Sequence, residues 1–344
     1  MITDSTVAGR QPQSGRAGDR AQPLLRVRGL RTEFRRDRGE ALRAVDGVSF
    51  DVGAGRALAI VGESGSGKSV TVRSLLRLLP RTARTTSGTA VFGDRDLLTL
   101  PEREMRRIRG RKIGMVFQNA MEAMNPTLTL ERQLTEHLVW HGICHRSEAR
   151  KRAIHALGDV GIPDPERRIR VYPFQLSGGM RQRAMIAMAM ITQPALLIAD
   201  EPTTAVDVTV QRQILDLLAV QKERGTGVIM ITHDLGVARA FCDDAVVMYA
   251  GRVAERAPVD ELLDRPLHPY SQGLLSSSVE VGGRERPLVP IPGSPPDLTH
   301  RPPGCPFAPR CRQADDGRCL DEQELITISS ARDAACWRVG DQDA

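Results

Sequence analysis

The stretch that decides the fold of this 344-residue chain is Gly62-Glu63-Ser64-Gly65-Ser66-Gly67-Lys68-Ser69, hereafter the phosphate loop. It fits the pattern G-x-x-x-x-G-K-[ST], and it lies between the apolar run 57–61, typical of a buried strand, and the helix-compatible run 70–79. The glycines let backbone N–H groups point inward at a polyphosphate, and the helix adds its positive N-terminal end. We expect Lys68 to reach the β- and γ-phosphates and Ser69 to hold Mg²⁺. A glycine-rich turn without a ligand is the alternative, which the motifs further along disfavour.

Composition narrows the class of protein. The chain is 41% hydrophobic and 26% charged, as expected for a soluble globular protein, and no apolar run approaches the roughly 18 to 20 residues that span a bilayer. The N-terminus lacks the apolar core of a secretion signal, so we expect a cytoplasmic protein with at most a peripheral membrane role. The net charge of +6 is spread along the chain and aromatics are only 3%, which favours a solvated surface over a nucleic-acid interface.

The N-terminal part predicts a disordered arm followed by strands. Residues 1–22 are rich in Gly, Gln, Ser and Arg without periodicity. Segments 24–34, 44–52 and about 89–92 have strand patterns, which indicates a small antiparallel sheet beside the phosphate loop. Phe34 lies on this sheet, where it would either stack on an adenine ring or pack as an ordinary strand residue.

The middle of the chain predicts a helical insertion in an α/β core. Residues 101–157 are mostly helical in pattern, with a short strand at 113–117 that ends before Gln118. Apolar runs then precede Asp200 and His233, with a helix expected over 208–224 between them. Alternating strands and helices predict a doubly wound parallel sheet with its active groups at the carboxyl ends of the strands.

These strand ends carry the side chains that phosphoryl transfer needs. We expect Asp200 to join Ser69 in the shell of Mg²⁺, and Glu201 to polarise the attacking water as a general base. His233 would contact the γ-phosphate or hold that water, and Gln118 would reach Mg²⁺ or water with its amide oxygen. Each of these residues is weak evidence by itself, because an acidic pair, a lone histidine and a surface glutamine are usually structural. The prediction therefore depends on the order of these residues along the chain.

A second anion site follows from Ser177-Gly178-Gly179-Met180. Ser177 is a good helix N-cap, and the two glycines expose backbone N–H groups at a helix start. One γ-phosphate does not need two cradles from the same subunit. We therefore expect this segment to close on ATP bound to a partner chain, although a helix start without ligand is the alternative.

Taken in order, these motifs resemble those of the ATP-binding cassette ATPases over residues 23–265, with the helical insertion at about 101–192. The resemblance implies a P-loop NTPase with a RecA-like parallel core, an antiparallel β subdomain and a helical subdomain. It adds Asp207 to the residues that face the partner's ATP, and Met180 stands where the family often has glutamine. The matching segments are the phosphate loop, Gln118, Leu176-Ser177-Gly178-Gly179, Leu197-Ile198-Ala199-Asp200-Glu201-Pro202, Asp207 and His233.

Within that family the chain is similar to the ATPase subunits of dipeptide and oligopeptide importers. Phe117-Gln118-Asn119-Ala120-Met121 looks like their extended glutamine loop, although Ala120 stands where proline is usual. The C-terminal extension, residues 266–344, resembles their tail. The matching tail segments are His268-Pro269-Tyr270-Ser271-Gln272-Gly273-Leu274-Leu275, Ile291-Pro292-Gly293-Ser294-Pro295-Pro296, Gly304-Cys305-Pro306-Phe307 and Pro309-Arg310-Cys311.

Four of the six cysteines lie in this proline-punctuated tail, at Cys305, Cys311, Cys319 and Cys336, and structural disulfides are not expected in a cytosolic chain. Four thiols in one short segment are typical of a site for Zn²⁺ or an iron–sulfur cluster, and reduced metal-free thiols are the alternative. Their spacing does not choose between these. The resemblance to the importer subunits favours a [4Fe–4S] cluster.

The resemblance implies an ATP-hydrolysing subunit of an importer, peripheral to the cell membrane on its cytoplasmic side. Its implied partners are two membrane permeases, a second homologous ATPase and an extracytoplasmic peptide-binding protein, and no nucleic acid. Cargo other than peptides, such as a nickel chelate or glutathione, stays open. A soluble nucleic-acid ATPase is disfavoured because Lys68 and Asp200 are too close in sequence for a long coiled-coil arm. A regulator that never hydrolyses ATP is disfavoured because Glu201 and His233 are both present.

Overall fold

The computed structural model describes residues 22–35, 41–119, 123–203, 208–278 and 289–340. The expected N-terminal arm lies outside these ranges except for Gln22, and so does Asp207. In the described residues, no helix is long and apolar enough to cross a membrane.

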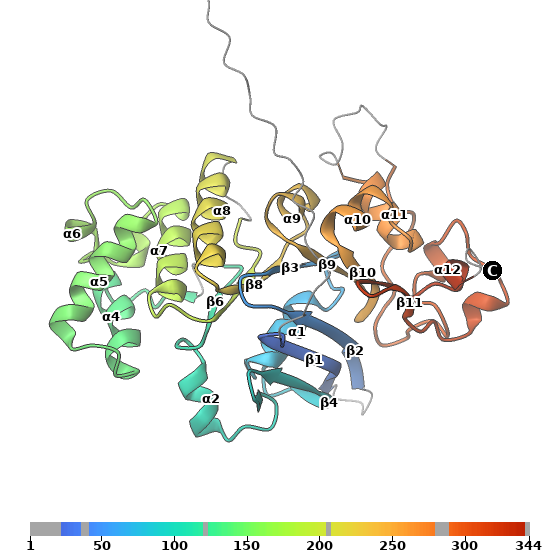
Figure 1. The fold of residues 1–344 in the computed structure, drawn as a ribbon, viewed down its shortest axis with the longest axis horizontal. Coiled ribbons are helices and arrows are strands. Elements are labelled where there is room, and N and C mark those ends of the chain that lie inside the picture. The colour runs from blue at the N-terminus through green and yellow to red at the C-terminus, as the bar shows by residue number, and fades with distance from the viewer. Residues whose placement is uncertain (1–21, 36–40, 120–122, 204–207, 279–288, 341–344) are drawn as a thin grey trace, which may run out of the picture.

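An eight-stranded sheet runs through the centre of the molecule (Figure 1). Five of its strands are parallel, and three of these are buried along their whole length, which accounts for their continuous apolar runs. The sequence predicted four of the five parallel strands and missed Asp244–Tyr249. The strand order is β11-β12-β10-β9-β3-β8-β7-β6. The bounds are β3 Ala57–Val61, β6 Ile113–Val116, β7 Leu196–Asp200, β8 Gly227–Ile231, β9 Asp244–Tyr249, β10 Arg252–Pro258, β11 Ile326–Ser329 and β12 Arg332–Ala334.

A second, four-stranded antiparallel sheet has the order β2-β1-β4-β5. Its bounds are β1 Leu25–Arg35, β2 Ala41–Val52, β4 Ala83–Phe92 and β5 Arg95–Asp96, so the sequence predicted its first strands well and indicated only the end of β4. Alternate residues such as Leu25, Val27 and Phe50 are fully buried, because one face of this sheet packs on the core and the other meets solvent.

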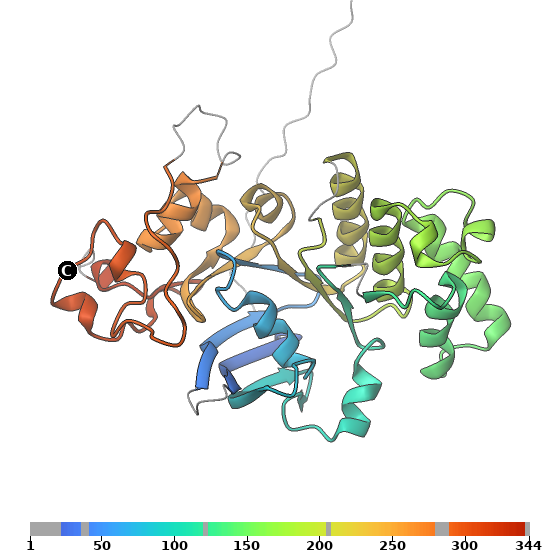
Figure 2. The same cartoon turned by 180° about the vertical axis from the view of Figure 1, so that it is seen from behind.

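Helix α1, Lys68–Leu75, lies between the two sheets (Figure 2). Its buried Val72 and Leu75 belong to one hydrophobic cluster with residues of β1 and β2 and with residues of β3, β8 and β9. The helix is shorter than the predicted run because the chain turns at Arg77, which has a φ of 53°. The phosphate loop is therefore followed by a helix that packs against both sheets.

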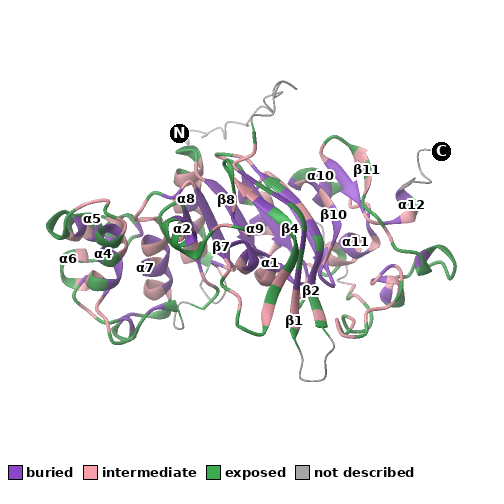
Figure 3. Ribbon diagram, turned by 90° about the horizontal axis from the view of Figure 1, so that it is seen from below, coloured by how far each residue is buried: buried purple, intermediate pink, exposed green. Residues whose placement is uncertain are grey.

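The other face of the central sheet is covered by α8, Val208–Glu223, and α9, Leu235–Phe241. The helical subdomain extends from one end of the sheet, and its outermost turns are exposed (Figure 3). The helices between the antiparallel sheet and β7 are α2 Glu102–Ile108, α4 Leu130–Trp140, α5 Arg146–Asp159, α6 Pro165–Arg168, η1 Pro173–Gln175 and α7 Gly178–Met190.

The C-terminal tail lies at the opposite end and joins the central sheet. Strand β12 pairs antiparallel with β10, and β11 pairs with β12, so two tail strands extend the ATPase sheet. Sequence analysis missed this pairing because the strands have only four and three residues. Helix α10, Val259–Asp264, precedes the tail, and the other tail elements are α11 Pro269–Ser276, η2 Ala308–Arg310, η3 Arg318–Leu320 and α12 Trp337–Gly340.

Candidate functional site

The phosphate loop follows β3 and lies against the ends of β2 and β9. Gly62 has a φ of 149°, and a Cβ added to it would collide with the carbonyl oxygen of Met248 on β9. Gly67 has a φ of 100°, and a Cβ there would collide with the carbonyl oxygen of Ala44 on β2. Only glycine allows this backbone conformation and this close approach, so both positions need it.

Lys68 begins α1 and lies folded back over the loop. Its Nζ donates hydrogen bonds to the carbonyl oxygens of Gly62 and Glu63, at 2.8 Å each. Burial lowers the pKa of Lys68, and the nearby carboxylates of Glu201 and Asp200 act in the opposite direction. The ammonium group is thus held inside the loop at the place where a polyphosphate would sit.

Ser69 and Asp200 meet beside it, as the sequence predicted. Ser69 Oγ donates to Asp200 Oδ1 at 2.8 Å, and Asp200 is completely buried at the end of β7. Burial raises the pKa of Asp200, against the hydrogen bond from Ser69 and the charge of Arg73. Asp200 Oδ2 is buried without a hydrogen-bond partner, and Arg73 Nη2 lies 3.6 Å from it. A hydroxyl and a carboxylate oxygen with spare capacity fit the oxygen ligands that Mg²⁺ requires.

Three strand ends bring Gln118, Glu201 and His233 together. Gln118 Nε2 donates to Glu201 Oε2 at 3.1 Å, and His233 Nδ1 lies 3.7 Å from the same oxygen. The Glu201 side chain is 16% exposed, whereas that of His233 is 65% exposed. The carboxylate of Glu201 is therefore sheltered by two neighbouring polar groups, one of which still faces solvent.

The second anion site is open to solvent in this chain. Ser177 Oγ caps α7 by accepting the N–H of Met180 at 3.3 Å, as the sequence predicted. Ser177 and Gly178 are exposed, and a Cβ added to Gly178 would meet nothing within 4 Å. Further along α7, Gln182 Nε2 donates to the carbonyl oxygen of Pro202, which ties this helix to the residue after Glu201.

Phe34 lies near the end of β1, opposite Leu42 on β2 and Ala83 on β4. Its side chain is half-buried, so one part of the ring is accessible. This placement agrees with either of the two sequence interpretations, adenine stacking or ordinary strand packing.

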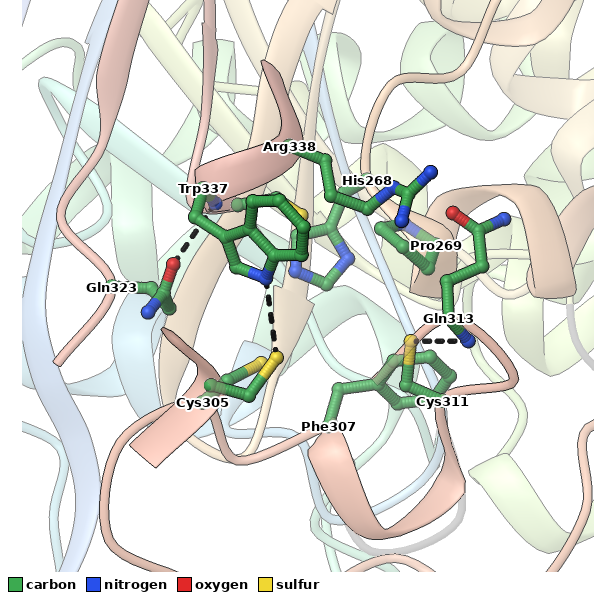
Figure 4. A pocket seen from close by; sticks show the side chains of 11 residues that line it. His268, Pro269, Cys305, Phe307, Cys311, Gln313, Gln323, Trp337 and Arg338 are labelled. Carbon is green, nitrogen blue, oxygen red and sulfur yellow. Dashed lines mark hydrogen bonds between the residues drawn. The ribbon is translucent and has the colours of Figure 1, made fainter. Parts of the chain in front are cut away.

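The four tail cysteines line one small cavity together with His268, Phe307 and Trp337 (Figure 4). Cys319 Sγ accepts the indole N–H of Trp337 at 3.3 Å, and Cys311 Sγ accepts the backbone N–H of Gln313 at 3.3 Å. The cavity measures about 10 Å³, close to the room that one water molecule needs. All six cysteines are free in this structure.

Burial raises the pKa of the Cys305 thiol to about 11, and it also raises the pKa values of Cys311 and Cys336. These thiols are therefore protonated at neutral pH, and a metal ligand would have to lose its proton on binding. Across the described ranges, no three His, Cys, Asp or Glu side chains are grouped closely enough to hold a metal ion. The residue types suit a metal centre, but in this structure the four thiols are not grouped closely enough to hold a metal ion.

Sequence analysis missed the partners of Glu63. Its carboxylate forms a two-point ion pair with Arg310 of the tail, and its backbone N–H donates to the hydroxyl of Tyr270 on α11. It also missed Asp46, which is buried and paired with Arg31, Arg252 and Arg301. Arg310 lies within one of the tail segments that resemble the importer subunits, but no sequence pattern indicates which carboxylate it meets.

Two family models match this chain. Residues 45–204 match the model described as "ABC transporter", and residues 254–319 match "Oligopeptide/dipeptide transporter, C-terminal region". The first match contains the phosphate loop, Gln118, Ser177 and the Asp200-Glu201 pair, and the second contains three of the four tail cysteines.

Curated relatives cover nearly the whole chain. The chain is 49% identical to the "Probable peptide ABC transporter ATP-binding protein y4tR" of Sinorhizobium fredii, over 93% of this chain and 96% of the relative. It is 50% identical to the "Dipeptide transport ATP-binding protein DppD" of Bacillus subtilis, over 84% and 87%.

A solved structure titled as a dimeric post-hydrolysis state of the ATP-binding cassette MJ0796 bound to ADP and Pi superimposes with a TM-score of 0.62. It is 29% identical, and the match covers 69% of this chain and 99% of the other. Fold, site geometry and relatives agree: this chain belongs to the ATP-binding cassette family, as an ATP-hydrolysing subunit of its peptide transporters.

Proposed function

We propose that the chain couples Mg·ATP binding and hydrolysis to the uptake of dipeptides or oligopeptides through membrane permeases. The observation that supports this most is the meeting of Gln118, Glu201 and His233 at three strand ends, beside the phosphate loop and the Ser69–Asp200 pair. These are the groups that position a nucleotide, a metal ion and an attacking water for phosphoryl transfer.

The roles of the individual residues follow from their positions. The backbone amides of the phosphate loop and Lys68 would bind the phosphates, and Ser69, Gln118 and Asp200 would hold Mg²⁺. Mg²⁺, when bound there, would supply positive charge that neutralises the negative charge of the phosphates. Glu201 would accept a proton from the attacking water at Oε2, while His233 holds that water or the γ-phosphate. Phe34 would stack on the adenine ring.

Partner chains would complete the transporter. We place a second, homologous ATPase against the exposed Ser177-Gly178 helix start, with Gly179, Met180 and Asp207 at the same interface, so that each ATP lies between two chains. Two permeases would form the translocation path, and an extracytoplasmic binding protein would deliver the peptide. The subunit would then work at the cytoplasmic side of the membrane. Closing and reopening of the ATPase pair would drive alternating access.

Uptake by a strain that lacks this gene tests the proposed cargo. The strain is given dipeptides, longer peptides, a nickel chelate and glutathione, and it is complemented with the wild-type gene or with the Lys68→Ala variant. We expect peptide uptake to be lost, restored by the wild type and not by the variant. Loss of nickel or glutathione uptake alone would assign a different cargo, and unchanged uptake of all four would contradict an importer.

We also propose that Cys305, Cys311, Cys319 and Cys336 hold a [4Fe–4S] cluster, with Zn²⁺ as the alternative. This rests on the single cavity that all four thiols share (Figure 4). Four cysteine thiolates are the ligand set of a [4Fe–4S] cluster and also of a structural zinc site, and the resemblance of the tail to the importer subunits favours the cluster. The thiols would have to move outward on binding, because the cavity that they line has room for about one water molecule. The cluster would have a structural role and would hold the tail against the ATPase core.

Purification under anaerobic conditions tests the metal. We expect visible absorption from sulfur-to-iron charge transfer together with bound iron and sulfide, and we expect Cys336→Ser to lose both. Cys144→Ser is the matched control, since Cys144 lies far away on the connection between α4 and α5. A colourless, iron-free preparation with bound zinc would overturn the cluster assignment.

A further inference from the structure

We propose that Arg310 and Tyr270, both from the C-terminal tail, are positioning residues for the phosphate loop. They hold Glu63, the second residue of the loop, so that the amides after it keep the curl that receives ATP. The inference rests on the ATPase activity of this chain and adds two residues, more than 200 positions from the loop, to what determines its affinity for ATP.

Glu63 is fixed through three different groups. Its N–H donates to Tyr270 Oη at 2.8 Å, and its carbonyl oxygen accepts Lys68 Nζ at 2.8 Å. Its carboxylate oxygens accept Arg310 Nη1 at 2.6 Å and Nη2 at 3.0 Å, a bidentate geometry. Such charge-assisted pairs are about twice as strong as neutral hydrogen bonds and fix orientation as well as distance.

Arg310 is itself held rigidly. Its side chain is 5% exposed, and its Nε donates to the carbonyl oxygen of Pro292 at 2.8 Å. Its Nη1 also donates to Tyr249 Oη at 3.2 Å, and the guanidinium lies over the rings of Tyr249 and Phe307. The hydrogen bond to Glu63 raises the pKa of Arg310, so the guanidinium stays charged. A rigid, charged fork fits a role in fixing a backbone.

Tyr270 is the second tail residue that holds Glu63. It is fully buried on α11 and packs against Tyr249 and Phe307, with ring centroids 4.4 and 5.3 Å away. Its hydroxyl takes the N–H of Glu63, so the amides left for the phosphates begin at Ser64. One aromatic cluster thus joins β9, α11 and the segment of Arg310 under the phosphate loop.

These contacts differ from the one made by Lys68. Lys68 Nζ would turn to the phosphates when ATP binds, and its bond to the Glu63 carbonyl would compete with that role. The bonds of Arg310 and Tyr270 involve the side chain and the N–H of Glu63, and neither group is needed by the nucleotide. They can therefore hold the loop both before and after ATP binds, which lowers the ordering cost of binding.

The test compares full-length Arg310→Gln, Glu63→Gln and the double variant with wild type. Steady-state ATPase assays give KM and kcat, and titration with a fluorescent ATP analogue gives affinity. We expect each single variant to raise KM and Kd about tenfold while kcat stays within about twofold. The double variant should resemble either single one, because the two residues act as one pair.

Three further variants separate positioning from simple attachment of the tail. Arg310→Lys should recover only part of the affinity, because a lysine cannot make the two-point contact. Tyr270→Phe should also raise KM. Arg256→Gln is the control: Arg256 binds Asp333 and so joins β10 to the tail strand β12 away from the loop, and its loss should leave KM unchanged.

Unchanged ATP affinity in Glu63→Gln and Arg310→Gln would overturn the inference, as would a loss of kcat with KM unchanged. Additive effects in the double variant would overturn it too. If Arg310→Gln fails to fold, Glu63→Gln still decides, because it leaves the tail intact. Wild-type protein without ATPase activity would instead contradict the proposed function, so the two failures are distinguishable.

Discussion

At the scale of single residues, the neighbours Asp200 and Glu201 illustrate how one strand end serves two purposes. Asp200 is the last residue of β7 and accepts from Ser69. Glu201 has a φ of 49°, in the left-handed region that costs a non-glycine residue roughly 1 kcal/mol. This turn directs its carboxylate to Gln118 and His233 instead. The backbone conformation thus separates a candidate metal ligand from a candidate base.

Replacing Glu201 with glutamine tests that division. We expect Glu201→Gln to bind ATP as wild type does and to lower kcat by about 10²- to 10⁴-fold, because the amide cannot accept the proton from water. Turnover is followed by phosphate release and binding by nucleotide titration. Glu223→Gln, an exposed position at the end of α8, is the control that should keep full activity. Normal hydrolysis by Glu201→Gln would remove this residue from the base role.

Replacing Lys68 with alanine should act on binding itself. The ammonium group lies on two loop carbonyls and the residue is 6% exposed, so its loss removes the charge aimed at the phosphates. We expect ATP affinity to fall at least tenfold, measured by equilibrium titration, while Lys151→Ala on the exposed face of α5 has no effect. Equal affinities in the two variants would contradict the phosphate-loop assignment.

At the scale of elements, His137 in the last turn of α4 and His141, the C-cap that follows this helix, share one small space. His137 Nδ1 and His141 Nε2 lie 3.3 and 3.4 Å from the point where a Cβ on Gly110 would sit. Burial lowers the pKa of His137 despite the charge of Glu136. Burial, followed by the charges of His137 and Arg111, lowers the pKa of His141. Both imidazoles are therefore harder to protonate in the folded state than in the unfolded one.

This pair predicts a stability that depends on pH. The unfolded histidines take up protons below pH 6.5, and the folded ones do so only at lower pH. The contribution of this pair to the free energy of unfolding should therefore be constant above pH 6.5 and fall as the pH decreases below it. Urea unfolding of wild type at pH 7.5 and 5.5 should show this loss, and His137→Gln should show less of it. His155→Gln, on the exposed face of α5, is the control, and an identical pH response in His137→Gln would contradict the prediction.

Elements with strong local patterns were predictable, and those that depend on distant partners were not. The apolar runs that became β3, β7 and β8 stand out because strands buried on both faces contain almost no polar residue. The site residues at their ends followed from that. Strands β11 and β12 are too short to show a pattern, and the Arg310–Glu63 contact joins residues 247 positions apart. Asp207 lies outside the described residues, so its role stays a prediction.

At the scale of the whole molecule, the chain presents the start of α7 to solvent. Ser177 and Gly178 are exposed at a capped helix start, and no hydrogen bond or ion pair within the described ranges links them to the phosphate loop. A helix start of this kind can receive a negative charge from a neighbouring molecule. The predicted sandwich of two ATPase chains would use it in this way.

Cross-linking tests the sandwich. Ser177→Cys is labelled with a photoreactive probe in the presence of ATP, in a mixture of isotopically light and heavy transporter, and the linked peptides are identified by mass spectrometry. We expect the probe to join the phosphate loop of the partner ATPase, which is peptide 62–69 if the partner is a second copy of this chain and the matching peptide if it is a homologue. Ser277→Cys, at the exposed end of α11, and unmodified wild type are the controls for non-specific labelling. Links confined to the same chain in an active complex would contradict the arrangement.

The pairing of β12 with β10 has a practical consequence for anyone who shortens this protein. A truncated chain that stops near residue 265 would lack β12, and the outer edge of β10 would then have unpaired backbone donors and acceptors. Such an exposed edge is a template for self-association. In the full chain that outer position belongs to the four-residue strand β11, which is too brief to recruit another molecule easily. The tail strands therefore protect the edge of the sheet. Poor solubility after truncation would indicate an exposed sheet edge, not a core that fails to fold.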